Sequence, residues 1–350
     1  MPTPSIQILA LVTGSSETGG GIERFNQGLF EALSLNGTEV RLLGLVHQPT
    51  LLTKLSFVFS FLKTLCGSER FDLIFCGHLH LAFFAALLAS AKAVPFWLQL
   101  HGGEAWQKPS EGIRWAVRRA ALITAVSRYT RRRFLQWANV RPEKVLVLPN
   151  TYEEKFKPGP KPEYLIKRYG LENKTILLTV SRLSSQEKYK GHERILRLMP
   201  KLIQRSPDLV YVIAGEGDDR KRLEAVASEN HLDGCVRFVG KVDESELPDL
   251  YRMADLFVMP STGEGFGIVF LEAAACAIPV IGGNRDGSLD ALREGNMGRL
   301  IDPEEPAELG RAILDTLSSK KTGLEEIKKF SNHNFSQFVG SLLENGIRQC

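Results

Sequence analysis

Short, continuous apolar runs alternate along the chain with longer segments of mixed polarity. Runs that are apolar at successive positions are typical of parallel strands buried on both faces of a sheet. They lie at 6–12, 40–45, 71–76, 95–100, 122–127, 145–149, 175–180, 209–214, 236–242, 256–259, 279–283 and 298–301. Helices are expected at 22–35, 81–91, 192–203, 244–254, 268–276, 307–318 and 335–347. This alternation predicts an α/β protein built from doubly wound parallel sheets.

Length and local composition divide this pattern into two domains. A chain of 350 residues is long for one hydrophobic core and suits two. The strand at 145–149 ends the first series of strands, and residues 152–164, rich in lysine, glutamate and proline, interrupt the pattern. We therefore expect a linker at 152–164, with a first domain at 1–151 and a second domain at 152–330.

The stretch 258–283 carries the strongest signal for a binding site. The strand at 256–259 leads into a loop with three glycines, Gly263, Gly265 and Gly267, whose backbone amides can come close to a ligand. The helix that follows directs its first amides and the positive end of its dipole at this loop. The pattern therefore favours a bound anion.

Two carboxylates mark the same stretch. Glu264 lies in the loop, and Glu272 lies in the predicted helix at 268–276, which is apolar nearly all round. A buried carboxylate needs hydrogen-bond partners, because an unpaired charge in the interior is costly. We interpret Glu272 as an acceptor of hydrogen bonds from a diol such as a ribose; the alternative is a helix residue that faces solvent.

Two basic residues and a histidine follow predicted strands elsewhere in the chain. Arg182 and Lys190 come after the strand at 175–180, and a guanidinium with an ammonium group suits the charge of a diphosphate. His101 follows the strand at 95–100, at the carboxyl end where open α/β sheets bind ligands. The alternatives are solvated surface charges and a structural histidine.

These motifs together resemble a known family. E-G-F-G at 264–267, L-E-A-A-A-C at 271–276 and P-V-I at 279–281 resemble the paired-glutamate signature of retaining, nucleotide-sugar-dependent glycosyltransferases with the GT-B fold (glycosyltransferase family 4, group 1 type). G-G-G-I-E-R at 19–24 is similar to another motif of that family, whereas Gln337 stands where the family usually has tryptophan. The resemblance implies two Rossmann-like domains facing a central cleft, with 331–350 as a helix that crosses back to the first domain.

The resemblance also implies which residues contact the donor. The diphosphate is expected to meet Gly20, Gly21, Arg182, Lys190, Gly267, Ile268 and Val269. The sugar is expected to meet Glu264, Gly265, Phe266 and Gly267, with the segment Gly282–Asp286 bordering it. The nucleoside is expected to meet Gly215, Gly240, Val242 and Glu272. His101 and Glu264 are the expected catalytic residues; whether Glu264 is a nucleophile or a charge stabiliser stays open. No metal and no separate cofactor are expected, because the chain lacks a D-x-D triplet and the nucleotide sugar is itself the co-substrate.

The net charge of +4 conceals a difference between the two halves of the chain. Residues 1–150 contain 16 Lys and Arg against 9 Asp and Glu, a net +7, and the remainder contains 28 against 31, a net −3. The basic half suggests an acidic partner such as an anionic membrane surface or a pyrophosphate-linked acceptor, unless it only solubilises the surface. Seven arginines at 114–133 come without a nucleic-acid-binding motif, so we expect no nucleic acid partner.

The apolar segment 51–65 is interrupted only by Lys54 and Lys63 and is too short to span a bilayer. It can lie on a membrane surface, form a core helix or belong to the acceptor side, and the last two are favoured. Five scattered cysteines and the lack of a signal peptide predict a cytoplasmic protein. We expect its basic first domain to make peripheral contact with the inner face of the membrane.

The predicted reaction is transfer of a hexose, with UDP-glucose as the first candidate donor, to a saccharide or lipid-linked saccharide in polysaccharide biosynthesis. An NAD(P)-dependent oxidoreductase fits poorly, because Thr18 stands where its loop needs glycine and no tyrosine is followed four residues later by lysine. A GT-B nucleotide-sugar epimerase would lack the E-G-F-G loop followed by a second glutamate. A non-enzymatic sugar-nucleotide scaffold would look the same in sequence.

Overall fold

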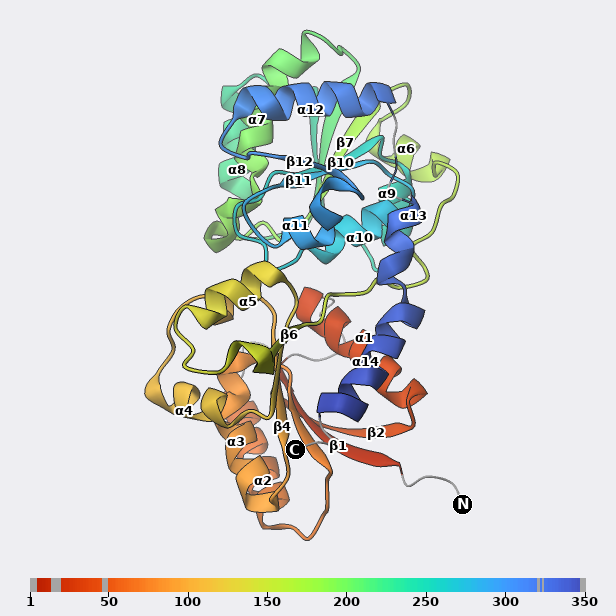
Figure 1. Cartoon of the computed structure of the whole chain (residues 1–350). Helices are drawn as coiled ribbons and strands as arrows, with labels where there is room; N and C mark the ends of the chain where they lie inside the picture. The colour runs from red at the N-terminus through yellow and green to blue at the C-terminus, as the bar shows by residue number, and fades with distance from the viewer. Residues whose placement is uncertain (1–4, 14–19, 46–49, 320–321, 323, 347–350) are drawn as a thin grey trace. The chain divides into compact units, whose positions relative to one another are not determined.

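The computed structural model describes residues 5–13, 20–45, 50–319, 322 and 324–346 (Figure 1). Its contacts divide the chain into an N-terminal unit, Met1–Thr151 with Ser331–Cys350, and a C-terminal unit, Tyr152–Phe330. Each unit has its own sheet and its own hydrophobic core. Thr18, Gly19 and the predicted end of the last helix at 347 lie outside the described residues.

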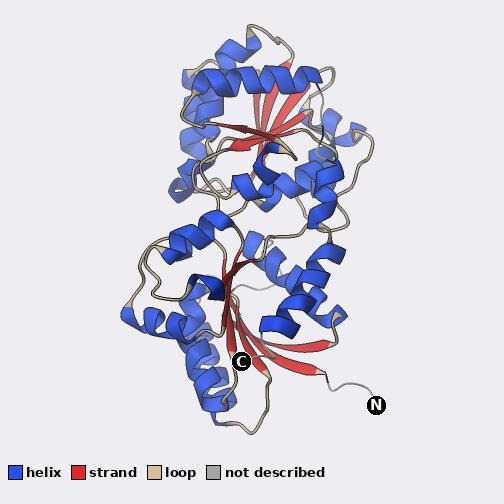
Figure 2. Cartoon of the chain, in the orientation of Figure 1, coloured by secondary structure: helices blue, strands red, loops and turns tan. Residues whose placement is uncertain are grey.

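The N-terminal unit is built on a sheet of six parallel strands with helices on both faces (Figure 2). The strands are β1 (Ile6–Thr13), β2 (Thr38–Leu45), β3 (Leu73–Cys76), β4 (Phe96–Leu100), β5 (Leu122–Ala125) and β6 (Val145–Val147). Their order across the sheet is β2-β1-β3-β4-β5-β6. The direction of growth reverses between β1 and β3, and ligands of such sheets bind at the carboxyl ends of strands beside a reversal.

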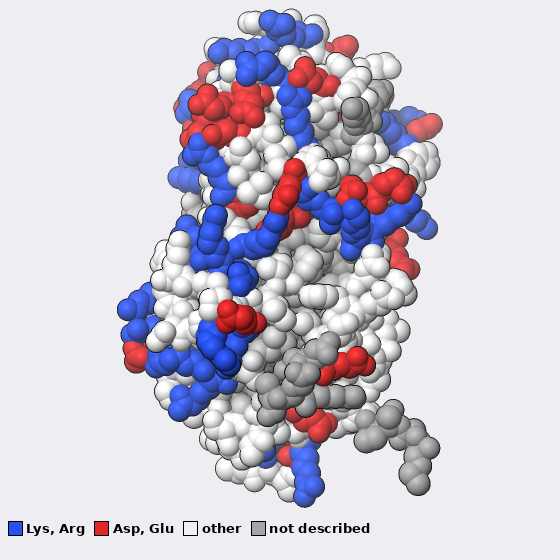
Figure 3. All heavy atoms as spheres, in the orientation of Figure 1, with Lys and Arg blue, Asp and Glu red and all other residues white. Residues whose placement is uncertain are grey.

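The helices of the N-terminal unit are α1 (Gly21–Leu35), α2 (Leu51–Cys66), α3 (Ala82–Lys92), α4 (Glu111–Arg119), α5 (Arg128–Leu135) and α14 (Asn332–Gly346). The Ser127 hydroxyl accepts a hydrogen bond from the Thr130 amide at 3.0 Å and so caps the start of α5. The arginines of 114–133 lie on α4 and α5 and contribute to a basic area on this face of the unit (Figure 3). The last helix, α14, packs on α1, where the rings of Phe25 and Phe335 meet edge to face at 6.0 Å.

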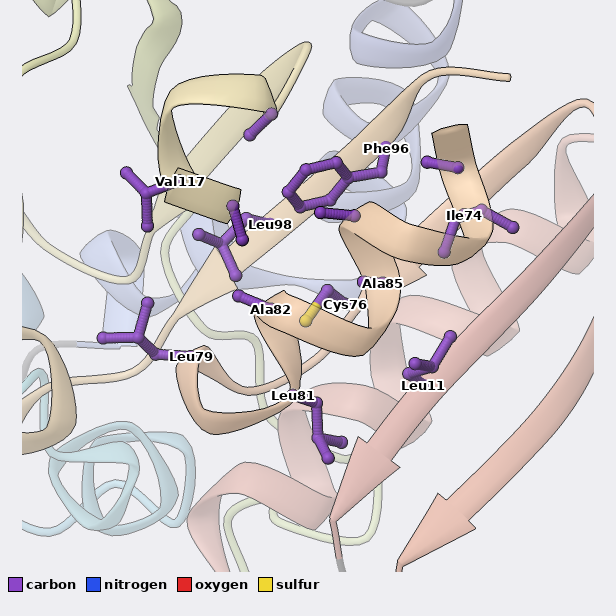
Figure 4. Close-up of a cluster of buried hydrophobic side chains, with 14 of the residues drawn as sticks. Leu11, Ile74, Cys76, Leu79, Leu81, Ala82, Ala85, Phe96, Leu98 and Val117 are labelled. Carbon is purple, nitrogen blue, oxygen red and sulfur yellow. The ribbon is translucent and has the colours of Figure 1, made fainter. Parts of the chain in front are cut away.

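The core of the N-terminal unit explains why its strands are apolar at successive positions. Leu11, Ile74 and Leu98 belong to three neighbouring strands and are fully buried in one cluster (Figure 4). Ala82 and Ala85 of α3 complete that cluster, and their small side chains let the helix lie close to the sheet. Every residue of β3 and of β4 is buried, so the sheet is covered on both faces, as parallel sheets require.

The C-terminal unit contains a second sheet of six parallel strands in the order β12-β11-β10-β7-β8-β9. The strands are β7 (Thr175–Val180), β8 (Leu209–Ala214), β9 (Val236–Gly240), β10 (Leu256–Met259), β11 (Val280–Gly283) and β12 (Arg299–Ile301). The helices are α6 (Glu163–Tyr169), α7 (His192–Ile203), α8 (Arg220–Glu229), α9 (Leu247–Arg252), α10 (Ile268–Ala275), α11 (Ser288–Ala291), α12 (Pro306–Ser319) and α13 (Leu324–Ile327). The order reverses between β7 and β10, and the two sheets confirm the predicted doubly wound α/β class.

Several predicted boundaries are wrong for local reasons. The strand expected to reach 242 ends at Gly240, whose φ of +77° is incompatible with an extended strand. The helix expected at 244–254 is shorter, because α9 begins only at Leu247. This start places Pro248 in the first turn, where a proline is tolerated. Helix α6 begins at Glu163, inside the expected linker at 152–164.

Short 3-10 helices connect some of these elements. They are η1 (Leu79–Leu81), η2 (Gly103–Ala105), η3 (Pro142–Lys144), η4 (Ser185–Lys190), η5 (Arg293–Gly295) and η6 (Lys328–Phe330). In the part of the chain that the structure describes, no helix has the length and apolar content needed to cross a lipid bilayer.

Candidate functional site

The connection from β10 to α10 lies beside the reversal of strand order in the C-terminal unit. Gly267 precedes α10 with a φ of +90°, and a Cβ at this position would lie 2.6 Å from the Phe270 ring. Only glycine satisfies both the left-handed backbone and this close approach. Ile268 and Val269 then start the helix, where amides have no intrahelical acceptor, and the first turn contains no acidic side chain. This helix end favours an anion.

A largely buried ion pair joins the loops that follow the two strands flanking the reversal. Lys190, after β7, places its Nζ 2.6 Å from Oε1 of Glu264, after β10, and both side chains are only 12% exposed. Burial acts to lower the pKa of the Lys190 ammonium, but the charges of Glu264, Tyr189 and Glu187 outweigh it and raise this pKa above its usual value. The ammonium group is therefore a fixed positive charge beside the start of α10.

Glu187 links the two predicted diphosphate contacts and was not identified from the sequence. Its carboxylate forms an ion pair with Arg182, and its other oxygen lies 3.8 Å from Nζ of Lys190. The side chain of Arg182 is 77% exposed, whereas that of Glu187 is 14% exposed. An incoming anion would therefore compete with Glu187 for both cations, most easily for the exposed guanidinium.

Asp286 holds the glycine-rich loop in place. Its Oδ2 accepts hydrogen bonds from the Glu264 amide and the Ser261 hydroxyl, both at 2.7 Å, and its Oδ1 accepts one from the Ser288 amide at 2.9 Å. Burial raises the pKa of this fully buried carboxyl above its ordinary value, although the three donors act in the opposite direction. A Cβ on Gly287 would lie 2.1 Å from the Gly265 carbonyl oxygen, so the loop and the segment after β11 fit closely.

Glu272 is a buried carboxylate with a phenol as a partner. Its side chain is fully buried in α10, and its Oε2 accepts a hydrogen bond from the Tyr251 hydroxyl at 2.6 Å. The expectation that a carboxylate in this helix needs partners is thus confirmed. A ribose would reach Glu272 only if neighbouring side chains gave way, so its predicted nucleoside contact stays a prediction.

The glycines after β8 and β9 lie together at the same edge of the sheet. The Gly215 amide donates to the Gly240 carbonyl at 2.8 Å. A Cβ on Gly215 would lie 1.8 Å from the Ser181 carbonyl oxygen, and φ there is +136°, so no other residue fits. Val242 follows in the half-buried segment after β9. These predicted nucleoside contacts therefore border the segment that carries Arg182.

A chain of buried polar side chains lies under the loop after β7. His192 Nε2 is 2.8 Å from the Ser181 hydroxyl, and its Nδ1 is 3.1 Å from the Tyr211 hydroxyl, which meets Thr179 Oγ1 at 2.9 Å. Burial, assisted by the charge of Lys190, lowers the pKa of His192 to about 3. The imidazole is therefore neutral at physiological pH and acts as a structural hydrogen-bonding group.

This buried histidine predicts a loss of stability in acid. The unfolded histidine takes up a proton near pH 6.5 and the folded one near pH 3, so the stabilising effect is complete above pH 6.5 and is lost as the pH falls. At pH 5 the loss is about 2 kcal/mol. Urea unfolding followed by circular dichroism at pH 7.5 and pH 5 should show a loss that is larger by this amount in the native protein than in His192→Gln. An equal loss in both proteins would contradict the assignment.

His101 and the first helix approach each other in the N-terminal unit. Gly20 is the N-cap of α1 and Gly21 its first residue. His101 follows β4, its ring meets that of Phe25 of α1 edge to face at 5.1 Å, and its Nε2 lies 2.9 Å from the Gly77 carbonyl. Because that carbonyl needs a donor, the proton is on Nε2 and Nδ1 is an acceptor. Burial lowers the pKa of His101 despite the opposing charge of Glu104, so the ring is neutral.

Within the C-terminal unit, the structure brings the predicted residues after β7 and β10 together, and it also shows what sequence reasoning missed. The ring of Phe266 is 2% exposed and packs edge to face on Phe330 at 5.8 Å, so only its backbone can meet a ligand. Glu187 looks like an ordinary loop residue in the sequence, whereas Asp286 lies in the segment 282–286 that was expected to border the donor sugar, and its hydrogen bonds to the glycine-rich loop were not foreseen. For Asp286, the available signal was its place after β11, the strand next to β10.

Two family profiles match the chain, one for each half. The profile described as glycosyl transferases group 1 matches residues 163–334, and the profile described as a glycosyl transferase 4-like domain matches residues 11–151. The matched ranges follow the two units closely, with the boundary at Thr151 in common with the N-terminal profile.

Curated relatives and solved structures agree with the profiles. A GDP-mannose-dependent alpha-(1-6)-phosphatidylinositol monomannoside mannosyltransferase of Mycolicibacterium smegmatis is 30% identical over 288 residues, 79% of this chain and 75% of the relative. A phosphatidyl-myo-inositol mannosyltransferase of Mycobacterium tuberculosis is 37% identical over 148 residues, 42% of this chain and 37% of the relative. The crystal structure of Anabaena HepE with UDP and glucose superposes with a TM-score of 0.79 at 22% identity, covering 97% of this chain and 99% of HepE, a likeness of fold.

Proposed function

This chain belongs to the glycosyl transferases group 1 family, and we propose that it transfers mannose from GDP-mannose to a lipid-linked acceptor with retention of configuration. That it is a glycosyltransferase using a nucleotide sugar follows from the family; the base, the sugar, the acceptor and the stereochemistry are the proposal. The observation that carries the proposed donor site is the largely buried Lys190–Glu264 ion pair, which joins the loops after β7 and β10.

The proposed donor site uses the positive groups at the β7 and β10 ends. Lys190, Arg182 and the amides of Gly267, Ile268 and Val269 would bind the diphosphate. When the bond between the sugar and the diphosphate breaks, negative charge builds up on the leaving phosphate oxygen, and pre-positioned cations and amides stabilise it. The largely buried position of Lys190 strengthens this effect, because water screens its charge only weakly.

The sugar is proposed to lie against Glu264, Gly265 and Gly267, with its anomeric carbon near the Glu264 carboxylate. That carboxylate would stabilise the positive charge of an oxocarbenium-like centre, and its pairing with Lys190 holds it in one orientation. The acceptor hydroxyl would form the new bond to the anomeric carbon as the nucleoside diphosphate leaves, and its proton would pass to the departing phosphate oxygen. His101, with Gly20 and Gly21, is proposed as a further donor contact, in which the neutral ring offers Nδ1 to a sugar hydroxyl.

The donor base is where this proposal departs from the first expectation of UDP-glucose. The relative that is 30% identical over 79% of the chain is GDP-mannose-dependent. HepE, with UDP and glucose bound, is only 22% identical and supports the fold alone. GDP-mannose is therefore the first candidate, UDP-glucose stays a prediction, and the proposed nucleoside contacts are Gly215, Gly240, Val242 and Glu272.

The acceptor is proposed to be lipid-linked because both mannosyltransferase relatives are named for phosphatidylinositol acceptors. A soluble growing saccharide, as in polysaccharide synthesis, remains the alternative from the sequence. The basic N-terminal half, with its net charge of +7 over residues 1–150 (16 basic and 9 acidic side chains), supports contact with an anionic membrane surface on the cytoplasmic side.

Thermal unfolding with nucleotides is the experiment that tests the donor. GDP, GDP-mannose, UDP and UDP-glucose are added separately with EDTA present throughout. A ligand at a hundred times its Kd should add about 2.7 kcal/mol of stability, a rise in Tm of about 5 to 10 °C. We expect the rise with GDP and GDP-mannose. A rise with only the uridine nucleotides would restore UDP-glucose, and a rise with a nicotinamide cofactor instead would contradict a sugar donor altogether.

The ribose contact is tested by changing the ligand as well as the protein. Because Glu272 is fully buried, a variant there risks a general loss of structure, so 2′-deoxy-GDP is compared with GDP on the unaltered protein. Glu272→Gln is then compared with Glu326→Gln, which removes a carboxylate from a surface ion pair of the same unit. The prediction requires that the deoxy ligand and Glu272→Gln each reduce the stabilisation, and that Glu326→Gln leave it unchanged.

A further inference from the structure

Helix α2 presents large apolar side chains to solvent along one face. The exposed fractions of these side chains lie between 42% and 78%, and the residues are Leu51, Leu52, Leu55, Val58, Phe59 and Leu62. The opposite face is a normal core face, where Phe57 and Phe61 are 6% exposed and meet the Phe84 ring of α3 edge to face at 5.6 and 5.2 Å. The helix is thus apolar on two faces, only one of which is packed.

The exposed side chains form one continuous stripe. At about 100° per residue they cover an arc of about 120° over a helix about 24 Å long. An exposed apolar area of this kind marks a docking surface more often than a plain solvent face. The segment was expected from its sequence to be a core helix or an acceptor-side element, but its core face accounts for fewer than half of its apolar residues.

Charge indicates what covers the stripe. Lys54 and Lys63 are exposed, and the helical spacing puts them at the two borders of the stripe, about 40° and 20° beyond its edges. The helix Leu51–Cys66 contains no acidic residue, and Glu69, just after it, forms an ion pair with Arg41. Figure 3 shows the surface over α2 as largely uncharged, with lysine and arginine side chains gathered over the neighbouring α4.

We propose that the outer face of α2 inserts into the surface of an anionic lipid bilayer, with Lys54 and Lys63 reaching the headgroups. An apolar face with basic residues at its borders and no acidic ones suits that environment, since leucine and phenylalanine enter the acyl boundary while lysine stems extend to phosphate. This inference rests on the proposed lipid-linked acceptor and adds how the protein would bind the membrane that holds it. It does not depend on which sugar is transferred.

Vesicle flotation with matched variants tests the proposal. Leu52→Ser/Leu55→Ser removes two stripe residues that are 78% and 56% exposed, and Leu35→Ser/Leu42→Ser removes two leucines of the same unit with the same exposed fractions, 78% and 56%. On vesicles of phosphatidylglycerol and phosphatidylcholine, we expect about a tenfold or greater loss of binding for the first pair only. Lys54→Gln and Lys63→Gln should each weaken binding about fivefold at low salt.

Other results would overturn the proposal in distinct ways. Equal binding of the two double-leucine variants to vesicles would show that α2 does not insert. Binding that is as tight on pure phosphatidylcholine would contradict the role of the lysines. Light scattering that shows a dimer disrupted by Leu52→Ser/Leu55→Ser, with vesicle binding intact, would assign the face to a second copy. The stabilisation by GDP or UDP is measured on the same variants and should not change, so a failure here stays separate from a failure of the donor assignment.

Discussion

Replacing Lys190 by methionine is expected to lower kcat/KM for sugar transfer by about a thousandfold. The substitution keeps the apolar stem but removes the charge that the proposal assigns to the leaving diphosphate, and losing one such group costs about 10²- to 10³-fold. It also leaves Glu264, whose side chain is 12% exposed, without its 2.6 Å ion-pair partner. Release of nucleoside diphosphate from the stabilising donor measures the rate, and calorimetry measures the nucleotide Kd.

Two further variants distinguish a role in the donor site from the loss of a surface charge. Lys188→Met removes an exposed lysine two residues away and should keep nearly full activity. Lys190→Arg keeps the charge with a different geometry and should recover part of the loss. Retention of more than a tenth of kcat/KM by Lys190→Met, or an equal loss in Lys188→Met, would contradict the assigned role.

The strands around the site could be predicted to the residue. β7, β8 and β10 coincide with the expected runs at 175–180, 209–214 and 256–259, because these strands are buried on both faces and polar loops bound them. Helices rich in charged residues, such as α4, were not predicted, because they bury few side chains. α4 buries only Ala116 and Val117, so its apolar face is too narrow to register in the sequence.

The partners of the site residues could not be predicted, because they depend on contacts between distant segments. Lys190 and Glu264 are 74 residues apart, and their ion pair exists only because β7 and β10 are neighbours in the sheet. Individually, each residue fits a solvated surface charge as well as a binding site. The buried position of Glu272 was inferred correctly from its apolar helix, but nothing in the sequence named Tyr251 as its donor.

Asp286→Asn is expected to destabilise the C-terminal unit by about 2 kcal/mol and to weaken nucleotide binding at least tenfold. Both carboxylate oxygens accept hydrogen bonds, one from Ser261 and the Glu264 amide, the other from the Ser288 amide. Asparagine has nearly the same shape, but its NH₂ group would face an N–H or O–H donor. Two buried donors that face each other have no acceptor, which costs about 1–3 kcal/mol. Because the Glu264 amide is one of the donors, the glycine-rich loop should lose its fixed position together with the stability.

A role in positioning this loop makes a narrower prediction than a role in general stability. Hydrogen exchange should accelerate in residues 260–267 of Asp286→Asn under conditions where the rest of the sheet stays protected. Asp315→Asn removes a carboxylate that is 63% exposed in α12 of the same unit, and its unfolding free energy and nucleotide Kd should be nearly unchanged. If Asp286→Asn lowers the stability but binds nucleotide normally, Asp286 supports the fold and the loop does not depend on it. If the stability and the nucleotide affinity both fall, and hydrogen exchange accelerates only in residues 260–267, the Asp286 carboxylate fixes the groups that meet the donor.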